Sequence, residues 1–521
     1  MNVAQALHRV AALYGDLPAA ICGDAALTHA QLDERSNRLA QAFLASGCRR
    51  GDRVATWVEN SLACIELDFA LAKAGLVRVS LNPRLTPAEA RYILDDAEAR
   101  AFVHGASFDA QIDAVVQGAA ALKQVLRVAE GASARGGSDD YEAFLRSGAT
   151  QAPPADFDAE HLYCLFYTSG TTGRPKGVML SHHAMLHVAW NLLMEIGPLE
   201  VGEKVLLMQP MSHGAGFFVL PQAMKGGVCI VMRQFDPAEV LRLAHEHQVE
   251  MIKLIPTMLQ RILRLPNLEA QKLPKLRAIV YGASPMPEEP LKRAIEVFGE
   301  GRLVQIYGQS ECPVTLTVLH GNEHRRDPAH PERLRSAGRP WATVETRVVD
   351  EQGRDLARGE IGELLVRGPH VMRGYWKRDD LTAKTLRDGW IHTNDMAKID
   401  DAGFVYLLGR QDEMIISGGY NIAPREVEDV LYQHAGVHEV AVLGEADPEW
   451  GQAVVAYAVL KSGGDEAAGR ALLEFARPHL GFKKPKRVYL MRELPKNPAG
   501  KIQKKALVPA AALCCIEGAT K

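Results

Sequence analysis

Short apolar runs alternate with helical patterns through the middle of the chain. Runs of this length with turn residues at their ends predict buried strands. Because strands that alternate with helices form parallel sheets with both faces covered, we predict an α/β fold. In such sheets ligands bind at the carboxyl ends of the strands. Five runs rich in branched side chains carry this prediction: residues 204–210, 228–233, 251–256, 276–282 and 302–308.

The N-terminal region shows the same alternation. Thr28 and Gln31 have the spacing of a capping box and predict a helix start. Residues 53–58 predict a strand, and residues 66–75 predict a helix that ends at a glycine. Residues 131–140 are polar and glycine-rich and predict a loop. The helices and strands of this region therefore fit the same α/β architecture.

The pattern of predicted helices and strands changes near Trp341 and again after Arg410. Between these two points the chain shows shorter β-like pieces separated by turns. After Arg410 a second unit begins, large enough for a small α+β domain. Two helical patterns enclose two strand-like runs in this unit, at residues 426–433, 437–445, 453–460 and 471–480.

The composition is that of an ordinary globular protein with more than one domain. The chain has 521 residues, of which 47% are hydrophobic and 24% charged, and its net charge is −3 with a pI of about 6.7. This length exceeds that of a single ordinary domain. Because the charge is near zero, no nucleic-acid partner is expected.

Membrane and secretion signals are not apparent in the sequence. No apolar run approaches the roughly 20 residues that span a bilayer. Residues 1–16 are typical of an amphipathic helix rather than a signal peptide. The eight cysteines are scattered without a CxxC pair, which favours free thiols in a reducing compartment. We therefore expect a cytoplasmic protein without a membrane span.

A loop rich in hydroxyl groups and glycine, residues 167–178, follows an apolar run at 161–166. It suits a polyphosphate, because glycine lets the backbone approach and turn its N–H groups inward. It is not a Walker A motif, because Pro175 stands where that motif has its second glycine. The candidate phosphate contacts are Thr168, Ser169, Gly170, Thr171, Thr172, Gly173 and Lys176.

A second candidate segment, residues 307–311, follows the last of the five predicted strands. Glu311 is a hard oxygen ligand of the kind that binds Mg²⁺ together with phosphate oxygens. Tyr307 offers a flat face to a base, and Ser310 offers a hydroxyl to a phosphate. Both candidate segments follow strands directly, so we expect them at the sheet edge where ligands bind.

Together with motifs further along the chain, these segments resemble the adenylate-forming superfamily, which includes acyl-CoA synthetases, luciferases and peptide-synthetase adenylation domains. Residues 167–178 are similar to its phosphate-binding signature, and matching motifs follow in the family's order to about residue 504. The family usually has threonine where Ser310 stands, and the hydroxyl is kept. The resemblance implies a large N-terminal domain of mixed sheets with flanking helices, residues 1–411, and a small mobile α+β C-terminal domain, residues 412–521.

The resemblance also implies roles for individual residues. Asp395 resembles the aspartate that accepts hydrogen bonds from ribose hydroxyls, and Arg410 resembles the arginine that contacts ribose and phosphate. Lys501 resembles the catalytic lysine that bridges the carboxylate and the α-phosphate. Catalysis is thus expected from Lys501, Glu311 and Ser310, with Glu311 also as the Mg²⁺ ligand. The remaining nucleotide contacts implied are Gly282, Ala283, Ser284, Tyr307, Gly308 and Gln309.

Other positions are implied for domain movement, the acid and coenzyme A. Asp412 falls at the family's hinge between the two domains. The acyl pocket and the pantetheine tunnel are implied at five positions: His213 and Gly214 for the pocket, and Gly418, Gly419 and Trp450 for the tunnel. Three residues depart from the family's usual choice: Asn394 for glycine, Glu413 for aspartate and Tyr420 for glutamate.

The implied reaction joins a small-molecule carboxylic acid to coenzyme A, with cleavage of ATP to AMP and pyrophosphate. The acid first forms an acyl-adenylate from Mg·ATP. The small domain then rotates about Asp412, and a thiol attacks the acyl carbonyl. ATP, Mg²⁺ and coenzyme A are therefore the expected cofactor and co-substrates.

Several alternatives stay open. An aromatic-acid CoA ligase shares these signatures. So does an adenylation enzyme that loads a carrier protein, although residues 210–217 contain no acid to pair with an α-amino group. A luciferase-like oxygenase has no specific support. The presence of Lys501, Glu311 and Asp395 argues against a non-catalytic nucleotide-binding protein.

The pocket segment gives a weak indication of the acid. Residues 212 and 214–216 are small, which indicates a roomy pocket. We expect a medium- or long-chain fatty acid, or an alicyclic acid, and a place in fatty-acid metabolism. The sequence does not indicate an oligomeric state, and a homodimer is among those it allows.

Overall fold

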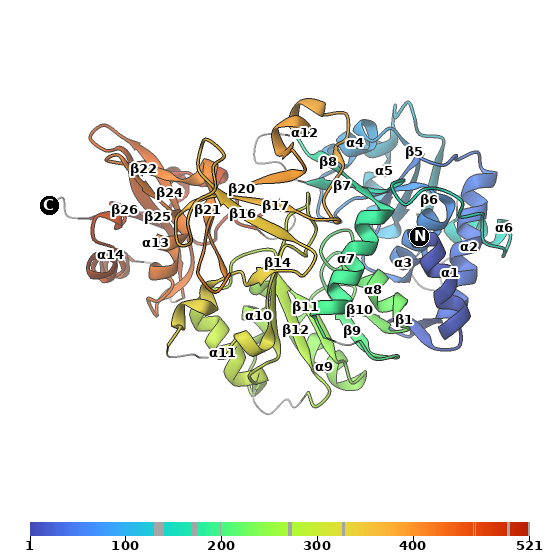
Figure 1. Ribbon diagram of the computed structural model, residues 1–521, viewed down its shortest axis with the longest axis horizontal. Helices are drawn as coiled ribbons and strands as arrows, with labels where there is room; N and C mark the ends of the chain where they lie inside the picture. Colours follow the sequence, from blue (N-terminus) through green and yellow to red (C-terminus); the bar gives the residue numbers. More distant parts are fainter. Residues whose placement is uncertain are drawn as a thin grey trace.

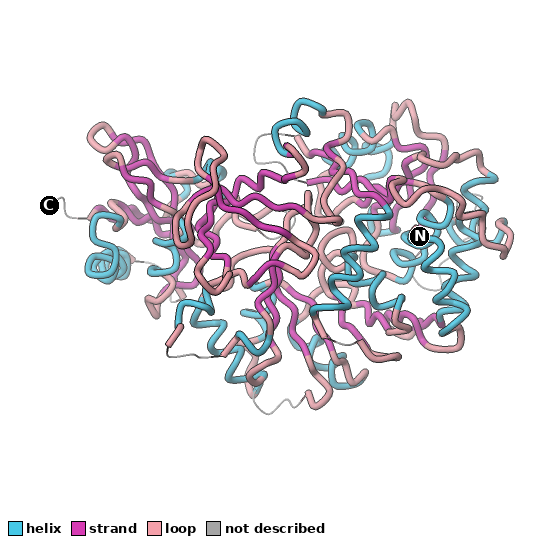
Figure 2. Tube along the Cα trace, viewed as in Figure 1, coloured by secondary structure: helices cyan, strands magenta, loops and turns pink. Residues whose placement is uncertain are grey.

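Four β-sheets organise the part of the chain that the structure describes (Figure 1, Figure 2). The computed structural model describes residues 1–129, 140–168, 174–197, 199–268, 273–325, 329–461, 463, 465–497 and 501–518. Three sheets are built from residues up to Arg410, and the fourth from residues 415 onward. In Figure 1 the fourth sheet lies at one end of the molecule, next to the third sheet.

The central apolar runs form a nine-stranded sheet. Six neighbouring strands are parallel, and antiparallel strands close both edges. The five predicted strands are confirmed, because each run contains one strand of this sheet. The order is β15 (Arg339–Pro340), β14 (Thr317–Leu319), β13 (Leu303–Tyr307), β12 (Ala278–Gly282), β11 (Met251–Leu254), β9 (Lys204–Leu207), β10 (Val228–Val231), β1 (Pro18–Cys22) and β2 (Ala25–Thr28).

A seven-stranded sheet holds the hydroxyl- and glycine-rich segment. Five neighbouring strands, from β7 to the edge strand β6, are parallel, while β8 and β18 are antiparallel to their neighbours. The pairing of β18 with β8 places Tyr375 opposite Val178. The order is β18 (Gly374–Tyr375), β8 (Lys176–Ser181), β7 (Leu162–Thr168), β4 (Val77–Ser80), β3 (Arg53–Trp57), β5 (Ala99–Gly105) and β6 (Gln124–Val128).

Helices lie between these strands, and their predicted signals are present. The Thr28 hydroxyl accepts a hydrogen bond from the Gln31 N–H at 3.2 Å, and the Gln31 side chain accepts one from the Thr28 N–H at 2.9 Å. Gly75 ends α3 at φ +66°, a left-handed conformation that glycine adopts without strain. The helices are α1 (Val3–Tyr14), α2 (His29–Ala45), α3 (Leu62–Ala74), α4 (Pro87–Asp96), α5 (Ile112–Val116), α6 (Tyr141–Ser147), α7 (His182–Glu195), α8 (Val219–Met224), α9 (Pro237–Glu246), α10 (Pro256–Ile262), α11 (Glu288–Phe298), α12 (Asp379–Thr385), α13 (Pro424–Leu431) and α14 (Glu466–Leu480).

Helices cover both faces of the nine-stranded sheet because its side chains alternate between two apolar cores. On one face, Met251 and Val280 pack in a core that includes residues of α7 and α8. On the other face, Ile252 and Ile279 pack with residues of α9, α10 and α11. The predicted α/β fold with covered parallel strands is therefore confirmed.

The third sheet is five-stranded and antiparallel, and its strands β20 and β21 carry two of the predicted site residues. Asp395 on β20 lies opposite Arg410 on β21. The strands are β16 (Glu345–Val349), β17 (Gly362–Arg367), β20 (Trp390–Ile399) and β19 (Leu386–Arg387), with β21 (Val405–Arg410) paired to β20.

The fourth sheet has its own apolar core, to which α13 and α14 contribute Val427 and Leu472. The change of sheet falls between Arg410 and Ile415, the interval that contains the proposed domain boundary at 411/412. The strands are β23 (Tyr420–Ile422), β22 (Ile415–Ser417), β25 (Gly451–Leu460), β26 (Arg487–Leu490) and β27 (Cys514–Glu517), with β24 (Val437–Asp447) paired to β25.

Two other expectations concern the whole chain. Among the described residues, no helix combines the length and apolar character needed to cross a bilayer. All eight cysteines are free thiols, as their spacing predicted. The loop expected at 131–140 lies almost wholly outside the described residues.

Candidate active site

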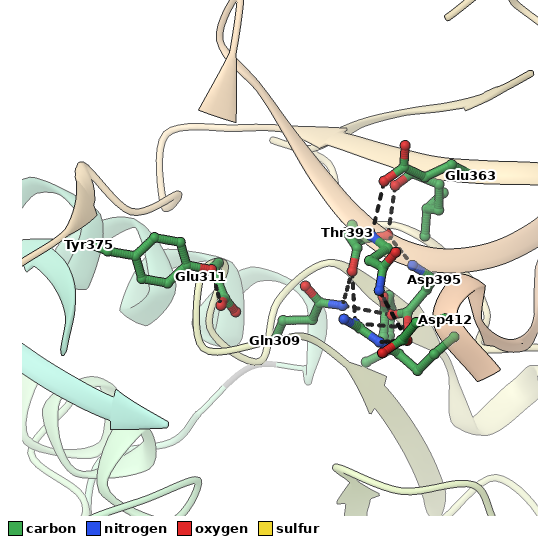
Figure 3. A network of polar contacts seen from close by, with 11 residues as sticks. Gln309, Glu311, Glu363, Tyr375, Thr393, Asp395 and Asp412 are labelled. Carbon is green, nitrogen blue, oxygen red and sulfur yellow. Dashed lines mark hydrogen bonds and ion pairs between the residues drawn. The ribbon is translucent and has the colours of Figure 1, made fainter. Parts of the chain in front are cut away.

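The candidate nucleotide residues meet where β13 ends beside β20 and β21 (Figure 3). One oxygen of Asp395 accepts hydrogen bonds from the Tyr307 hydroxyl and, at 2.7 Å, from the Gln309 amide. The other oxygen accepts one from Arg410 Nη1 at 3.2 Å. Burial, followed by the charge of Asp395, raises the pKa of Tyr307 well above its ordinary value. Three donors therefore fix the position of the carboxylate.

Thr393 positions these donors, and the sequence did not single it out as a site residue. Its carbonyl accepts from Gln309 Nε2 at 3.0 Å and from Arg410 Nη1 at 2.8 Å. Its hydroxyl donates to the Leu364 carbonyl at 2.7 Å and accepts from the Asp395 N–H at 3.0 Å. Only its place two residues before Asp395 could have indicated this role.

Asn394 stands in a backbone conformation that explains the family's preference for glycine. Its φ is +58°, in the left-handed region. Asparagine enters this region more readily than most residues, so the turn tolerates it. Its N–H donates to Glu363 at 3.1 Å, and its side-chain amide donates to Asp412 at 3.2 Å (Figure 3). The substitution thus ties β20 to the candidate hinge residue.

Glu311 lies next to Tyr375, whose hydroxyl donates to Glu311 Oε1 at 2.6 Å (Figure 3). The ammonium of Lys176 lies 5.5 Å from the centroid of the Tyr375 ring. Tyr375 therefore links the candidate metal ligand to the candidate phosphate-binding lysine. Sequence reasoning missed Tyr375, because it reaches the site only through the short strand β18.

The carboxylate of Glu311 fits a Mg²⁺ ion only as one ligand among several. Its Oε2 atom has no hydrogen-bond partner among the described residues, so one carboxylate oxygen is left for a ligand. No cluster of three His, Cys, Asp or Glu side chains within the described ranges suits a metal ion. This donor set matches an ion that keeps waters and substrate phosphates as its other ligands.

Replacing Tyr375 with phenylalanine is expected to raise the KM for Mg·ATP about tenfold or more. The ring and its contact with Lys176 are kept, while one hydrogen bond to a charged group, worth about 1.5–3 kcal/mol, is lost. Initial rates at varied Mg·ATP measure this effect. Tyr457→Phe is the matched control, because the Tyr457 hydroxyl donates to Glu445 at 3.0 Å outside the site. An unchanged KM in Tyr375→Phe contradicts a role for this contact.

The hydroxyl-rich loop is anchored at both ends. Thr168 closes β7 and pairs with Lys176 at the start of β8. A Cβ on Gly177 would lie 3.0 Å from the Tyr167 ring, so glycine is needed for this close approach. The Tyr167 hydroxyl donates to Asp96 at 2.5 Å. The predicted contacts Ser169, Gly170, Thr171, Thr172 and Gly173 lie outside the described residues.

Glycines at the strand ends keep backbones close together at the candidate base-binding edge. A Cβ on Gly282 would lie 2.1 Å from the Ile306 carbonyl, and one on Gly308 would lie 2.4 Å from the Val314 nitrogen. Ala283 follows Gly282 at φ +72°, and Ser284 is half-buried beside it. Larger residues at either glycine would force the strand ends apart.

His213 lies on the acyl side of the site. Its ring centroid is 5.2 Å from that of Phe166, and its Nδ1 is 3.2 Å from the Ser212 hydroxyl. Burial, followed by the charge of Lys501, lowers the pKa of His213 to about 4. The imidazole is therefore neutral at neutral pH.

Lys501 enters the site from the C-terminal part of the chain. Asn497 holds its backbone: the Asn497 side chain accepts from the Lys501 N–H at 2.9 Å, and the Asn497 N–H donates to the Lys501 carbonyl at 2.8 Å. Lys501 keeps exposed surface. The protein around it nevertheless removes water from the ammonium, and this desolvation lowers the pKa of Lys501. Arg410 lowers the pKa further, while Asp395 and Glu311 raise it. The ammonium thus lies within electrostatic reach of both candidate carboxylates.

The candidate hinge and tunnel residues lie close to one another in sequence but make separate contacts. Asp412 lies 3.8 Å from Arg410 Nε. The Gly418 N–H donates to the Trp450 carbonyl at 2.8 Å, and a Cβ on Gly418 would lie 2.8 Å from the Trp450 ring. Gly419 follows at φ +82°. The structure therefore brings Gly418 and Trp450 together, while their part in coenzyme A binding stays a prediction.

Comparison with known proteins places this geometry in a family. Residues 7–376 match the AMP-binding enzyme model, and residues 426–501 match the model of the AMP-binding enzyme C-terminal domain. A medium/long-chain-fatty-acid–CoA ligase of Mycobacterium tuberculosis is 35% identical, with 94% of this chain and 86% of the relative covered. A feruloyl-CoA synthase of Amycolatopsis is 37% identical, with 92% and 93% covered.

A solved structure agrees with these matches. ATP-bound MatB from Rhodopseudomonas palustris superposes with a TM-score of 0.86 at 30% identity, covering 97% of this chain and 98% of that one. Both family models and this superposition follow the resemblance seen in the motifs. The chain therefore belongs to the AMP-binding enzyme family, within the adenylate-forming superfamily.

Proposed function

We propose that this chain is an ATP-dependent acyl-CoA synthetase that converts a carboxylic acid, ATP and coenzyme A to acyl-CoA, AMP and pyrophosphate. The observation that carries the proposal is that the Lys501 ammonium lies within electrostatic reach of both Glu311 and Asp395. Relatives along nearly the whole chain are named as CoA ligases. Activation of a carboxylate at the α-phosphorus needs these charges in one place.

In the first half-reaction a carboxylate oxygen attacks the α-phosphorus, and the bond to pyrophosphate breaks. Lys501 places its ammonium between the two anions and offsets the charge that gathers on the phosphoryl oxygens. Asp395 and Arg410 hold the ribose, and Thr168 and Lys176 hold the departing phosphates. Glu311 and the phosphate oxygens would hold a Mg²⁺ ion, which supplies charge neutralisation when bound.

In the second half-reaction the thiol of coenzyme A attacks the acyl carbonyl, and the carbonyl–oxygen bond to AMP breaks. Lys501 is not needed for this step. We propose that residues 412–521 rotate about Asp412, which withdraws Lys501 and brings Gly419 and Trp450 towards the adenylate. The contacts of Asp412 with Asn394 and Arg410 are those that such a rotation would break first.

The acid is proposed to be a medium- or long-chain fatty acid or an alicyclic acid. The relatives include a fatty-acid ligase, a feruloyl-CoA synthase and an indoleacetate–CoA ligase. An aromatic acid is therefore the second candidate. A relative from Streptomyces coeruleorubidus is named as a fatty acid–acyl-carrier-protein ligase, which keeps a carrier-protein acceptor as the third.

The test is release of AMP from Mg·ATP with a panel of carboxylic acids, with and without coenzyme A. We expect AMP release that depends on both the acid and coenzyme A, together with formation of the matching thioester. Pyrophosphate exchange that coenzyme A does not accelerate would indicate a carrier-protein acceptor. ADP as the product, or ATP cleavage that no acid stimulates, would contradict the proposal.

A further inference from the structure

A lysine is buried in the wall of the nine-stranded sheet on the acyl side. Lys253, on β11, is 2% exposed. Side chains of a strand alternate between faces, so Lys253 shares the face of Met251 rather than that of Ile252. Met251, Phe218 and Leu207, which lies opposite Lys253 on β9, belong to one core. Lys253 therefore points into the core that also contains the loop after β9.

The ammonium of Lys253 has little to compensate its burial. Its one hydrogen bond among the described residues goes to the Leu254 carbonyl at 3.0 Å, and no described carboxylate lies within ion-pair distance. The ring centroid of Phe218 lies 5.8 Å away. Burial alone lowers the pKa of Lys253 to about 7. Since an ammonium has three N–H donors, two of them find no acceptor in the described part of the chain.

A second buried lysine shows how this chain satisfies such a group when its role is structural. Lys73, 1% exposed on α3, donates to Asp33 at 2.6 Å, to Ser36 at 2.8 Å and to Asn37 at 2.7 Å. One carboxylate and two neutral oxygens thus occupy all of its donors. Because buried charges are normally paired in this way, the isolation of Lys253 requires a different explanation.

Aromatic contacts connect Lys253 to the candidate acyl pocket. His213 contacts Phe166 with ring centroids 5.2 Å apart, and Phe166 contacts Phe217 at 5.5 Å. Phe217 and Phe218 belong to η2 (Gly216–Phe218), directly after His213 and Gly214. The Phe218 ring that the ammonium approaches therefore belongs to the residue directly after Phe217, the last member of this aromatic chain.

Another buried polar group without a partner lies beside the same segment. Gln209 is 6% exposed, and its Oε1 atom has no hydrogen-bond partner among the described residues. That oxygen lies 3.7 Å from the position that a Cβ on Gly214 would occupy. Two unsatisfied polar side chains, from β11 and from the end of β9, therefore converge on one loop of the candidate pocket.

We propose that Lys253 and Gln209 bind an oxygen-bearing group of the acid substrate, distant from the carboxylate that is activated. Lys253 supplies N–H donors to this oxygen, which can belong to a hydroxyl or to a second carboxylate. Gln209 supplies an acceptor to a hydroxyl. The inference rests on the proposed acyl-CoA synthetase function, and it narrows the acid to one that carries an oxygen at its far end. An acid whose chain carries no oxygen beyond the activated carboxylate leaves Lys253 and Gln209 unpaired, so it binds less tightly.

The test uses acids matched in chain length whose far end is a methyl, a hydroxyl or a carboxylate group. In the wild-type enzyme we expect kcat/KM for at least one oxygen-bearing acid to exceed that for the methyl acid at least tenfold. In Lys253→Met, which keeps the volume of the side chain, this ratio should fall at least tenfold. Gln209→Leu should lower it for the hydroxyl acid only. Lys73→Met is the matched control and should leave the ratio as in wild type.

A measurement without turnover separates failure of this inference from failure of the proposed function. The oxygen-bearing acid should raise the melting temperature of the wild-type protein more than the methyl acid does, and Lys253→Met should remove the difference. Equal shifts for all three acids, or an unchanged kcat/KM ratio in Lys253→Met, overturn the inference. Absence of AMP release with every acid overturns the proposed function, and the thermal shifts still decide whether Lys253 binds the far oxygen.

The stability of Lys253→Met gives an independent check on the isolation of this lysine. The folded pKa of about 7 lies below the ordinary value of 10.5, so the folded state binds fewer protons between these values. The lysine therefore destabilises the protein most below about pH 7, and this cost fades as the pH rises towards 10.5. Denaturant unfolding should show Lys253→Met more stable than wild type at pH 6 and equally stable near pH 10. Lower stability at both values contradicts an unpaired ammonium.

Discussion

Lys501→Ala is expected to slow formation of the acyl-adenylate at least a thousandfold while the protein remains folded. Lys501 is the cation that can lie between the attacking carboxylate and the α-phosphate, because its ammonium lies within electrostatic reach of Asp395 and Glu311. A charge that orients both reactants and stabilises the transition state accounts for about 4 kcal/mol, which is a thousandfold in rate. Acid-dependent exchange of labelled pyrophosphate into ATP measures this step alone.

The second half-reaction distinguishes this role from a general loss of structure. When acyl-adenylate prepared chemically is supplied with coenzyme A, Lys501→Ala should form thioester within a few-fold of the wild-type rate. Lys496→Ala is the matched control, because Lys496 lies five residues before Lys501 but pairs with Glu439 at 2.6 Å. Pyrophosphate exchange within tenfold of wild type in Lys501→Ala would show that another group activates the acid.

Asp395→Asn is expected to raise the KM for ATP about tenfold to a hundredfold and to lower kcat less. Asp395 accepts hydrogen bonds from Tyr307, Gln309 and Arg410. Its Oδ1 atom has only Arg410 as a hydrogen-bond partner among the described residues. This oxygen can therefore also accept a hydrogen bond from a ribose hydroxyl. The amide removes the negative charge and turns one acceptor into a donor. Hydrogen bonds to charged groups contribute about 1.5–3 kcal/mol each, which corresponds to this loss.

Initial rates at varied ATP measure the effect of Asp395→Asn. Asp400→Asn is its control, since Asp400 lies at the far end of the β20–β21 pair and accepts from the Phe404 N–H at 2.8 Å. 2′-Deoxy-ATP provides a second test, because it lacks one of the two ribose hydroxyls. The KM values of wild type and Asp395→Asn should differ less for this nucleotide than for ATP. An unchanged KM for ATP in Asp395→Asn would remove Asp395 from the nucleotide site.

The sequence predicted those parts of the fold and site that depend on local patterns. The apolar runs ending at Gly282 and Tyr307 became neighbouring parallel strands, because branched residues between turn signals favour buried strands. Asp395, Arg410 and Lys501 could be named from their motifs. Their proximity was expected from the resemblance rather than from spacing, since Asp395 and Arg410 lie on two strands and Lys501 lies near the C-terminus, outside any helix or strand.

Residues whose role depends on long-range pairing could not be found in this way. Tyr375 contacts Glu311 only because a two-residue strand pairs with β8. Thr393 acts through its carbonyl, which any residue type has. In the sequence Lys253 is one polar residue in an apolar run. The register of β11 with β9 and β12 determines which face of the sheet its side chain occupies. Side-chain direction along a strand changes with every residue, so register must be known first.

The most direct test of the central claim is the fate of a carboxylate oxygen during one turnover. An acid labelled with ¹⁸O in its carboxylate is incubated with Mg·ATP and coenzyme A, and the AMP is examined by mass spectrometry. If the carboxylate attacks the α-phosphorus and the thiol then breaks the carbonyl–oxygen bond, each AMP carries one ¹⁸O atom. Unlabelled AMP, or label in phosphate instead, would contradict an acyl-adenylate and with it the proposed function.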